Sequence, residues 1–352
     1  MRSIEAMEKE IGYQLAYLQK LELPRPEAKF HDCVITGSGD SYVASLVTKY
    51  MSGYNVVCCH PMDIVFDPAI VRNRKVYLVS ISGRTRATIC AARVAKKNAL
   101  RTIAVTTRPD SPLAKCSDDI ISIRYNCTNI PTSGTIGFTA SMLYCLSLVS
   151  KVDYLSNLKH IYNQSIVQAD YLSNYKLKSS ASHIFLGNGI FFPAALYGSL
   201  KMNEVFGVRS FAYSLDEFCH SPIFSIKNKD RIIIVGSDKR DLNVSKKITN
   251  QISEINIVTF YIDCRNGGMI ESLLKSIFFL QLYVVKLAVK NMVKDCYFLR
   301  NQRLLLLVLS LSTAHADYPR RVAIYLQTFT LQFDPTRLSR INLVIFSWIR
   351  TD

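Results

Sequence analysis

The sequence lacks the signals of several protein classes. Its ten cysteines are dispersed and form no CxxC pair, so they indicate neither a structural metal site nor a disulfide framework. The longest late apolar run, Leu304 to Leu311, is too short to cross a bilayer, and the charged N-terminal stretch does not resemble a signal peptide. We therefore expect a protein of the reducing cytoplasm that uses no metal or cofactor and has no membrane partner.

Acidic residues are few: 27 Asp and Glu stand against 43 Lys and Arg, a formal net charge of +16. Such a charge attracts anions, from small phosphorylated molecules to nucleic acids. The basic residues are scattered and form no long run of the kind found in a nucleic-acid-binding arm, so no nucleic-acid partner is expected. A nucleic-acid binder stays an alternative on net charge alone, and a steeply salt-dependent DNA affinity would favour it.

What the sequence does contain is an alternation of apolar strands and helical patterns from about residue 32 to residue 150. This alternation predicts a parallel sheet with helices on both faces, and in such sheets ligands bind beyond the carboxyl ends of the strands. The predicted strands are Cys33–Thr36, Val56–Cys59, Val76–Val79, Thr102–Thr106 and Ile120–Ile123, and the main predicted helices are Ser41–Tyr50, Ala87–Lys97 and Ile136–Val149.

A hydroxyl-rich turn, Ser80–Thr85 (SISGRT), lies between a predicted strand and the helix that follows it. The first N–H groups of a helix lack partners and its dipole is positive there, so a bound anion is favoured. The serine and threonine hydroxyls add donors for phosphate oxygens, and Gly83 permits a close backbone approach. Ser and Thr are also common N-caps, so an ordinary cap is the competing interpretation.

The strand–loop–helix unit occurs twice. Val34–Leu46 (VITGSGDSYVASL) is matched by Ile184–Leu196 (IFLGNGIFFPAAL), and Gly37 and Gly39 each have a counterpart 150 residues later. The repeat indicates an internal duplication. In the second copy the strand Arg231–Val235 is followed by Gly236-Ser237-Asp238, which lacks the SxSGxT set, so only the first copy is expected to bind phosphate.

Five motifs together resemble those of tandem SIS (sugar isomerase) domain proteins, and the resemblance covers about residues 30–292. It is closest to the isomerase half of glutamine–fructose-6-phosphate amidotransferase and to glucosamine-6-phosphate deaminases. The motifs are Gly37–Ser41 (GSGDS), Ser80–Thr85 (SISGRT), Pro131–Ser141 (PTSGTIGFTAS), Leu186–Glu204 (LGNGIFFPAALYGSLKMNE) and Ala212–Pro222 (AYSLDEFCHSP).

The resemblance implies two flavodoxin-like α/β sandwiches, each a five-stranded parallel sheet flanked by helices, and a homodimer. The expected divisions of the chain are an N-terminal helical segment (1–29), a first SIS domain (30–150), a helical connector (151–175), a second SIS domain (176–294, with a closing helix from about Gly268 to Met292) and a tail (295–352). The tail has no clean helical or strand period and does not resemble the family's lysine-bearing C-terminal segment.

The resemblance also implies roles for individual residues. Ser41, Ser80, Ser82, Gly83 and Thr85 would hold the phosphate of a hexose phosphate, with Gly39 and Thr135 in loops beside the substrate. Glu204 would move a proton between C1 and C2, and Lys201 would lie near the sugar. His220 would assist ring opening across the dimer interface. The last three residues each have a structural alternative: Glu204 as a helix-surface glutamate, Lys201 as a solvated lysine and His220 as a turn residue.

The chain departs from the family pattern at Asp40, Ile81, Arg84 and Tyr197, and Asp40 puts a carboxylate beside the expected phosphate. We expect an isomerase of a hexose or aminohexose 6-phosphate acting through an enediol or enolamine, with glucosamine-6-phosphate deamination as one form. No N-terminal glutaminase cysteine is present, so an alternative is the isomerase subunit of glucosamine-6-phosphate synthesis with a separate ammonia source. A non-catalytic sugar-phosphate sensor is the other alternative, although no helix-turn-helix accompanies it.

Overall fold

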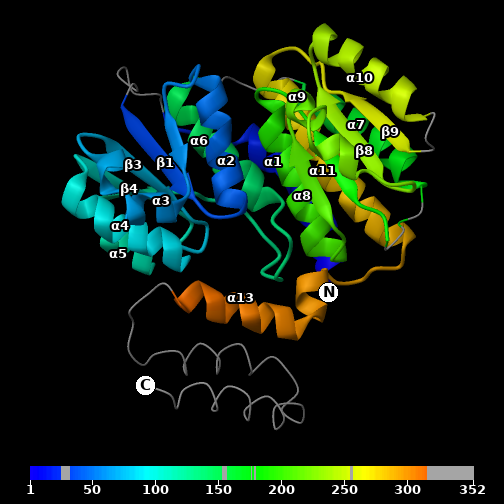
Figure 1. Cartoon of the computed structure of the whole chain (residues 1–352). Coiled ribbons are helices and arrows are strands. Elements are labelled where there is room, and N and C mark those ends of the chain that lie inside the picture. The colour runs from blue at the N-terminus through cyan, green and yellow to red at the C-terminus, as the bar shows by residue number, and fades with distance from the viewer. Residues whose placement is uncertain (25–31, 153–156, 176, 178–179, 254–256, 315–352) are drawn as a thin grey trace, which may run out of the picture. The chain divides into compact units, whose positions relative to one another are not determined.

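The computed structural model describes residues 1–24, 32–152, 157–175, 177, 180–253 and 257–314. Residues Met1–Ser312 form one compact unit, which contains two parallel sheets (Figure 1). We call the sheet of the N-terminal half with its helices the first lobe, and the later sheet with its helices the second lobe.

The first lobe confirms the predicted five-stranded parallel sheet, with strand order β2-β1-β3-β4-β5. All five residues of β1 are buried, because helices cover both faces of the sheet. Its strands are β1 (Cys33–Gly37), β2 (Val57–Cys59), β3 (Lys75–Val79), β4 (Arg101–Thr106) and β5 (Asp119–Ser122). Its helices are α2 (Asp40–Met51), α3 (Pro61–Phe66), η1 (Pro68–Val71), α4 (Arg86–Asn98), α5 (Pro112–Cys116) and α6 (Ile136–Val149).

The second lobe has four strands in the described residues, in the order β7-β6-β8-β9, so the expectation of five is wrong there. In the first lobe α5 and β5 separate β4 from α6, whereas β9 is followed within a few residues by α11, leaving no chain for a fifth strand. The strands are β6 (His183–Leu186), β7 (Ser210–Tyr213), β8 (Arg231–Gly236) and β9 (Val258–Asp263). The helices are α8 (Phe191–Phe206), α9 (Leu215–Phe218), η2 (Pro222–Ser225), α10 (Lys239–Ser253) and α11 (Met269–Lys290).

The two glycine pairs have matching geometry. A Cβ on Gly37 would lie 2.8 Å from Cβ of Ser41, and one on Gly187 would collide with the backbone of Phe191, so in each copy the strand end touches the helix that follows. Gly39 and Gly189 have φ values of +56° and +53°, which favour glycine. The first four strands of each lobe also occupy equivalent positions in their sheets, which supports the predicted duplication.

The two lobes are joined by a layer of helices between their sheets (Figure 1). In this layer α2 packs against α6 and α8, while α1 (Ser3–Gln19) packs against α6 and α11. The helix α7 (Leu158–Ser173), in the predicted connector, packs along α11. One hydrophobic cluster therefore includes side chains from both lobes and from α1. The first and second lobes share a core, and this fixes residues from one lobe beside those of the other.

In the described part of the chain, α11 is the helix that is long and apolar enough to cross a membrane. However, 89% of its most apolar window is buried inside the fold. This burial is that of a core helix.

The chain beyond Asp295 begins with two helices, α12 (Tyr297–Arg300) and α13 (Gln302–Ala314). The sequence pattern left residue 295 onwards without an assigned structure, and the fold adds α13 there. The apolar run Leu304 to Leu311 lies within this helix. A continuous apolar run is compatible with a helix even where it shows no amphipathic period. The remainder of the predicted tail, residues 315–352, lies outside the described residues.

Candidate functional site

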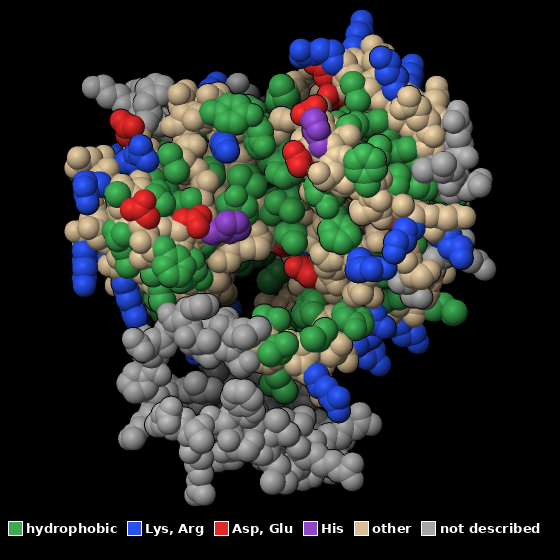
Figure 2. Space-filling view, viewed as in Figure 1, with side chains coloured by type: hydrophobic (Ala, Val, Ile, Leu, Met, Phe, Trp, Pro, Cys, Tyr) green, Lys and Arg blue, Asp and Glu red, His purple; other side chains and the backbone are tan. Residues whose placement is uncertain are grey.

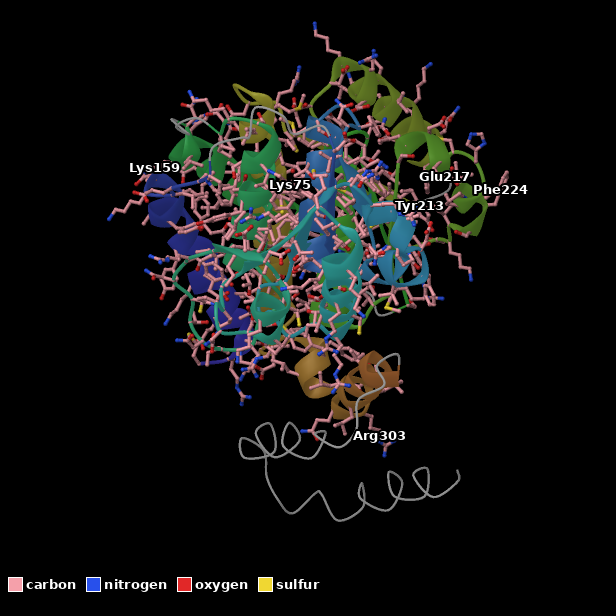
Figure 3. All side chains as sticks on the ribbon, turned by 90° about the vertical axis from the view of Figure 1, so that its left-hand side faces the viewer. Lys75, Lys159, Tyr213, Glu217, Phe224 and Arg303 are labelled. Atoms are coloured by element: carbon pink, nitrogen blue, oxygen red, sulfur yellow. The ribbon has the colours of Figure 1, made fainter. Side chains whose placement is uncertain are left out.

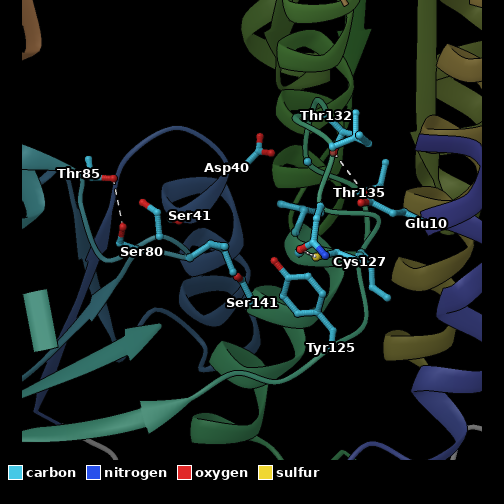
Figure 4. Close-up of a pocket in the computed structure, with 18 of the residues that line it drawn as sticks. Glu10, Asp40, Ser41, Ser80, Thr85, Tyr125, Cys127, Thr132, Thr135 and Ser141 are labelled. Atoms are coloured by element: carbon cyan, nitrogen blue, oxygen red, sulfur yellow. Dashed lines mark hydrogen bonds between the residues drawn. The ribbon is translucent and has the colours of Figure 1, made fainter. Parts of the chain in front are cut away.

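A cavity of about 360 Å³ lies beyond the carboxyl ends of β1 and β3, where a ligand is expected in a parallel sheet (Figure 4). Its wall combines α1, the turns after β1 and β3, and the segment from Tyr125 to Ser141. The polar side chains that line it are Glu10, Ser38, Asp40, Ser41, Ser80, Ser82, Thr85, Tyr125, Cys127, Asn129, Thr132, Thr135 and Ser141. Five residues predicted for the substrate site (Ser41, Ser80, Ser82, Thr85 and Thr135) are thus brought to one cavity.

The hydroxyls of the β3–α4 turn face the N-terminus of α4. Thr85 is the N-cap residue of this helix, yet its side chain makes no capping hydrogen bond. Its Oγ1 lies 3.1 Å from Oγ of Ser80 instead (Figure 4). The hydroxyl of Ser82 accepts a bond from N of Arg84 at 3.3 Å. The N-cap interpretation therefore does not account for Thr85, and the helix end keeps backbone donors for an anion.

The two predicted glycines shape these turns without lining the cavity. Gly39 is the N-cap of α2, and its φ of +56° turns the chain into that helix. Gly83 has a φ of +60°, and a Cβ there would collide with the side chain of Ser111. Both positions thus require glycine for backbone reasons, and each presents the hydroxyl of a neighbouring residue to the cavity.

A buried lysine of the second lobe reaches the cavity wall. Lys201, on α8, is 1% exposed, and its Nζ donates to Oδ2 of Asp40 at 2.8 Å and to Oε2 of Glu204 at 2.6 Å. Asp40 is the first residue of α2 and lines the cavity. The predicted interpretation of Lys201 as a solvated lysine is therefore wrong, and the expected conflict between Asp40 and a bound anion is reduced by this ion pair.

The ion pair shifts the titration of its members. Burial by itself would lower the pKa of Lys201, but the carboxylates of Asp40 and Glu204 raise it, so the ammonium stays charged. Burial raises the pKa of Asp40 to about 6, against the opposing effect of Lys201. Lys201 thus links an acid on the cavity wall to the predicted catalytic acid.

The loop before α6 holds the two lobes together at the cavity. The hydroxyl of Ser133 donates to Oε2 of Glu204, and the hydroxyl of Tyr197 donates to the carbonyl oxygen of Gly134 at 2.7 Å. Tyr197 is buried and stacks on Phe138 with ring centroids 3.9 Å apart. Tyr197, where the chain differs from the family pattern, therefore has a structural role: it positions the loop before α6. Glu204 is part of this network and is more than a helix-surface glutamate, although its side chain remains 38% exposed.

Glu10 was not predicted from the sequence as part of the site. It is 4% exposed on α1, and its carboxylate accepts bonds from N and Oγ1 of Thr128 at 3.1 and 2.8 Å. It also accepts from the hydroxyls of Thr132 and Thr135 at 3.2 and 2.9 Å (Figure 4). One carboxylate thus orders the loop that forms one wall of the cavity.

A signal for Glu10 exists in the sequence. Within α1 the buried stripe includes Ile4, Met7, Ile11 and Leu18, and Glu10 and Gln14 lie on the same face. Polar residues in the apolar stripe of an amphipathic helix require buried partners. Gln14 has one in Gln281, whose amide donates to the carbonyl oxygen of Thr135 at 3.2 Å.

His220 does not reach the cavity within this chain. Its side chain is 70% exposed, and Nε2 lies 3.9 Å from Oδ2 of Asp216. Glu217 and Phe224, which flank it in sequence, project from the periphery of the second lobe (Figure 3). The structure of the single chain therefore keeps His220 apart from the other predicted catalytic residues.

Comparison with known proteins identifies the first lobe. A family model described as "SIS domain" matches residues 28–151. This range contains the GSGDS and SISGRT turns and all five strands of the first sheet. The chain contains a SIS domain. The second lobe lies outside the range of the match.

Curated relatives cover more of the chain. Glutamine–fructose-6-phosphate aminotransferase (isomerizing) of Clostridium acetobutylicum is 27% identical over 248 residues, which are 63% of this chain and 40% of that protein. The protein of the same name from Escherichia coli K12 is 25% identical over 254 residues, 65% of this chain and 41% of the relative. The chain thus spans about two fifths of the length of these relatives.

Solved structures share the fold across both lobes. Glucosamine-6-phosphate deaminase from Thermotoga maritima has a TM-score of 0.63 at 20% identity, covering 83% of this chain and 94% of that one. The C-terminal domain of glucosamine-fructose-6-phosphate aminotransferase from Francisella tularensis has a TM-score of 0.61 at 19% identity, with 83% and 95% covered. The SIS domain and the second lobe are therefore arranged in a fold that phosphosugar enzymes also have.

Proposed function

We propose that this chain isomerises a hexose or aminohexose 6-phosphate, with loss of ammonia where the substrate is glucosamine 6-phosphate. The observation that carries the proposal is a chain of contacts that ends at the cavity wall: Glu204 is bonded to Lys201, and Lys201 to Asp40, which lines the same cavity as Ser80 and Thr85. Glu204 and Lys201 are not themselves among the described lining residues. If the hydroxyls of the SIS domain hold the phosphate, the opposite end of the ligand lies toward Glu204 of the second lobe.

The proposed chemistry needs one group that takes and returns a proton. Glu204 removes the proton from C2 of the open-chain aldose, and the C–H electrons form the C1=C2 bond of the enediol or enolamine while O1 takes up a proton. The same carboxylate then delivers a proton to C1 as the substituent at C2 loses one and becomes C=O or C=NH. Where the substituent is an amine, water hydrolyses the C=NH group to the ketose and ammonia. Ser41, Ser80, Ser82 and Thr85 bind the phosphate with the N-terminus of α4. Lys201 and Ser133 orient the carboxylate of Glu204 through the bonds described above.

The proposal extends to the second lobe and the assembly. The matching strand order and glycine pairs support the interpretation of residues 176–294 as a second SIS unit. Because His220 is exposed on its own chain, a role in ring opening requires a second copy, so we propose a homodimer in which His220 faces the neighbouring cavity. A cytoplasmic protein with a sugar-phosphate ligand and no nucleic-acid partner is part of the same proposal.

A sensor without catalysis is the second candidate. The carboxylate of Glu204 is engaged by both Lys201 and Ser133, and no histidine is among the described residues that line the cavity. A site with these properties can bind a sugar phosphate without opening its ring. Turnover distinguishes the two candidates, because both predict binding.

The test is to incubate the full chain in D2O with glucosamine 6-phosphate and with fructose 6-phosphate, following ammonia release and deuterium at C1 and C2 by NMR. Glu204→Gln should lower turnover by roughly 100-fold or more, the scale of general-base catalysis, while ligand affinity changes little. Tight binding without turnover in the unaltered chain would favour the sensor, and equal loss of binding and turnover in Glu204→Gln would indicate a structural role for Glu204.

The phosphate contact is tested separately with Ser82→Ala. This change should weaken binding of glucosamine 6-phosphate by roughly 10-fold, the value of a hydrogen bond to a charged group, and leave binding of unphosphorylated glucosamine unchanged. Ser117→Ala, in the same lobe but away from the lining residues, is the control. An equal effect on both sugars would contradict a phosphate contact at Ser82.

A further inference from the structure

The strand β9 forms one edge of the second sheet, on the side of the second lobe that is away from the first lobe (Figure 1). In the first lobe the equivalent strand, β4, is covered by β5, which pairs along it from Ile103 to Thr106. Among the described residues of the second lobe no strand takes the place of β5. The outer edge of β9 therefore lacks the strand that covers its counterpart.

The burial of the two equivalent strands differs as this loss of cover predicts. In β4 every residue from Thr102 to Thr106 is buried. In β9 the one buried residue is Ile262, and the others are half-buried. The helix α10 packs on one face of β9, and Ile262 belongs to the hydrophobic cluster of α11 on the other. Solvent therefore reaches β9 along its edge.

The main-chain groups of β9 alternate in direction between β8 and this edge. The amide of Cys264, just after the strand, donates to the carbonyl oxygen of Gly236 at the end of β8, at 2.8 Å. Residues at even spacing from Cys264 therefore also face β8. The N–H and C=O groups of Thr259, Tyr261 and Asp263 face the open edge, where a further strand can pair with them.

The sequence of β9 does not protect this edge. Natural edge strands are kept from pairing by lysine, by proline, by bulges or by a covering segment. The strand reads VTFYID, which has neither lysine nor proline and consists mainly of good strand formers. Its one charged side chain, Asp263, is paired with Arg265. Lys and Arg side chains of this lobe gather over α10 instead (Figure 2).

Aromatic side chains lie beside the edge on the face opposite α10. The ring of Phe260 contacts that of Tyr175, with centroids 4.9 Å apart, and Tyr175 contacts Tyr171 at 6.2 Å. Tyr171 is 60% exposed and Tyr175 is 38% exposed. We call these three residues the aromatic strip. A second chain that continued the sheet would cover the strip together with the main-chain edge.

We propose that β9 pairs antiparallel with β9 of a second copy of this chain, so that two second lobes share one continuous sheet. A two-fold axis perpendicular to the sheet relates the identical edges and brings the two aromatic strips together on one face. With Tyr261 opposite Tyr261 of the partner subunit, Thr259 lies opposite Asp263 of the partner subunit, and all the outward residues are hydrogen-bonded in pairs. Phe260 then lies opposite Ile262 of the partner subunit, a favourable cross-strand pair.

A second copy is the occupant that the edge itself favours, because the edge is complementary to itself. The carboxylate of Asp263 meets a threonine across the axis, so no two like charges of β9 are opposed, and apolar side chains meet apolar ones. The interface is independent of the dimer proposed through His220. That residue follows α9, which comes directly after β7, the opposite edge of the same sheet.

Sedimentation equilibrium of the full chain tests the pairing, at concentrations of roughly 1 to 100 µM. The unaltered chain should associate reversibly. Thr259→Pro should weaken this association roughly 10- to 100-fold, because each copy loses an outward N–H and gains a ring at the edge. The N–H of Thr259 faces away from β8, so the rest of the sheet tolerates proline there. Thr259→Val keeps the N–H, and as the matched control it should associate like the unaltered chain.

Tyr175→Lys is a second variant, which leaves the strand unchanged. It places an unpaired charge where the two aromatic strips meet, so association should weaken by at least about 10-fold. Tyr13→Lys, on α1 and 43% exposed, is its control and should leave association unchanged. Circular dichroism and urea midpoints report whether each variant is folded.

The outcomes decide between a second copy and other cover for the edge. Association that is unchanged in folded Thr259→Pro and Tyr175→Lys would overturn the proposal and assign any assembly to another surface. A monomeric unaltered chain would overturn it as well, and slow hydrogen exchange of the Tyr261 amide in that monomer would show that another part of the same chain covers the edge. None of these results bears on sugar-phosphate binding in the first lobe, so the two proposals fail separately.

Discussion

Replacing Glu10 tests whether one buried carboxylate organises the cavity wall. The change Glu10→Ala removes the acceptor for four donors, of which the hydroxyl of Thr135 is almost fully buried and the amide of Thr128 cannot rotate to a new partner. Hydrogen bonds to charged groups contribute about 1.5–3 kcal/mol each. Counting only these two bonds, because water in the cavity can serve the other hydroxyls, the expected loss of unfolding free energy is about 3–6 kcal/mol.

Glu10→Gln should be milder. The amide oxygen can keep the two bonds from Thr128, and the hydroxyls of Thr132 and Thr135 can rotate to accept from the new NH2 group. The loss of charge alone should cost roughly 1–2 kcal/mol. Glu8→Ala, an exposed change on the same helix, is the control and should stay within about 0.5 kcal/mol of the unaltered chain.

The assay is urea unfolding of the three variants, followed by circular dichroism, together with hydrogen exchange of residues 125–135. Exchange in that segment should rise in Glu10→Ala and stay unchanged in Glu8→Ala, because of these two glutamates the one bonded to the loop is Glu10. If Glu10→Ala lost no more stability than Glu8→Ala, or left exchange of the loop unchanged, the view that Glu10 orders this wall would be refuted.

Two further predictions concern buried charge. His183 is fully buried in β6, and burial together with Arg231 lowers its pKa from 6.5 to about 3, so it is neutral in the folded state. As pH falls, His183 takes up a proton in the unfolded chain before it does so in the folded chain, and this favours unfolding. The free energy of unfolding is therefore unaffected by His183 above about pH 6.5 and decreases as pH falls toward 3; the decrease at pH 5 is about 2 kcal/mol. Urea midpoints at pH 7.5 and pH 5 should therefore differ by less in His183→Leu than in the unaltered chain or in the exposed control His160→Gln, and equal differences would contradict the assignment. Lys201→Met should cost about 3–5 kcal/mol in urea unfolding, since it leaves the carboxylate of Asp40 buried without its cation. Adding Asp40→Asn to Lys201→Met should recover at least about 1 kcal/mol, and strictly additive losses would show that the two side chains are not coupled.

Local patterns in the sequence were sufficient for the first lobe. Apolar runs of four or five residues alternating with helical patterns predicted its five parallel strands, and all five are present within a residue or two of the expected bounds. The same patterns predicted that Ser80, Ser82 and Thr85 lie beyond a strand end. The fifth strand expected in the second lobe came from the family resemblance and is wrong, because too little chain separates β9 from α11. Local patterns left α13 unassigned, since a continuous apolar run does not distinguish helix from strand.

The sequence alone therefore determined the β/α alternation, the repeated glycine turns and the hydroxyls of the phosphate-side turn. These depend on residues close together in the chain, where backbone geometry and helix ends limit the choices. Only the tertiary structure decided the rest. Lys201 meets Asp40 across 161 positions, and Glu10 meets Thr135 across 125, because the helices between the two sheets pack against one another. Contacts at such distances in the chain are set by packing of the whole fold, and no local periodicity records them.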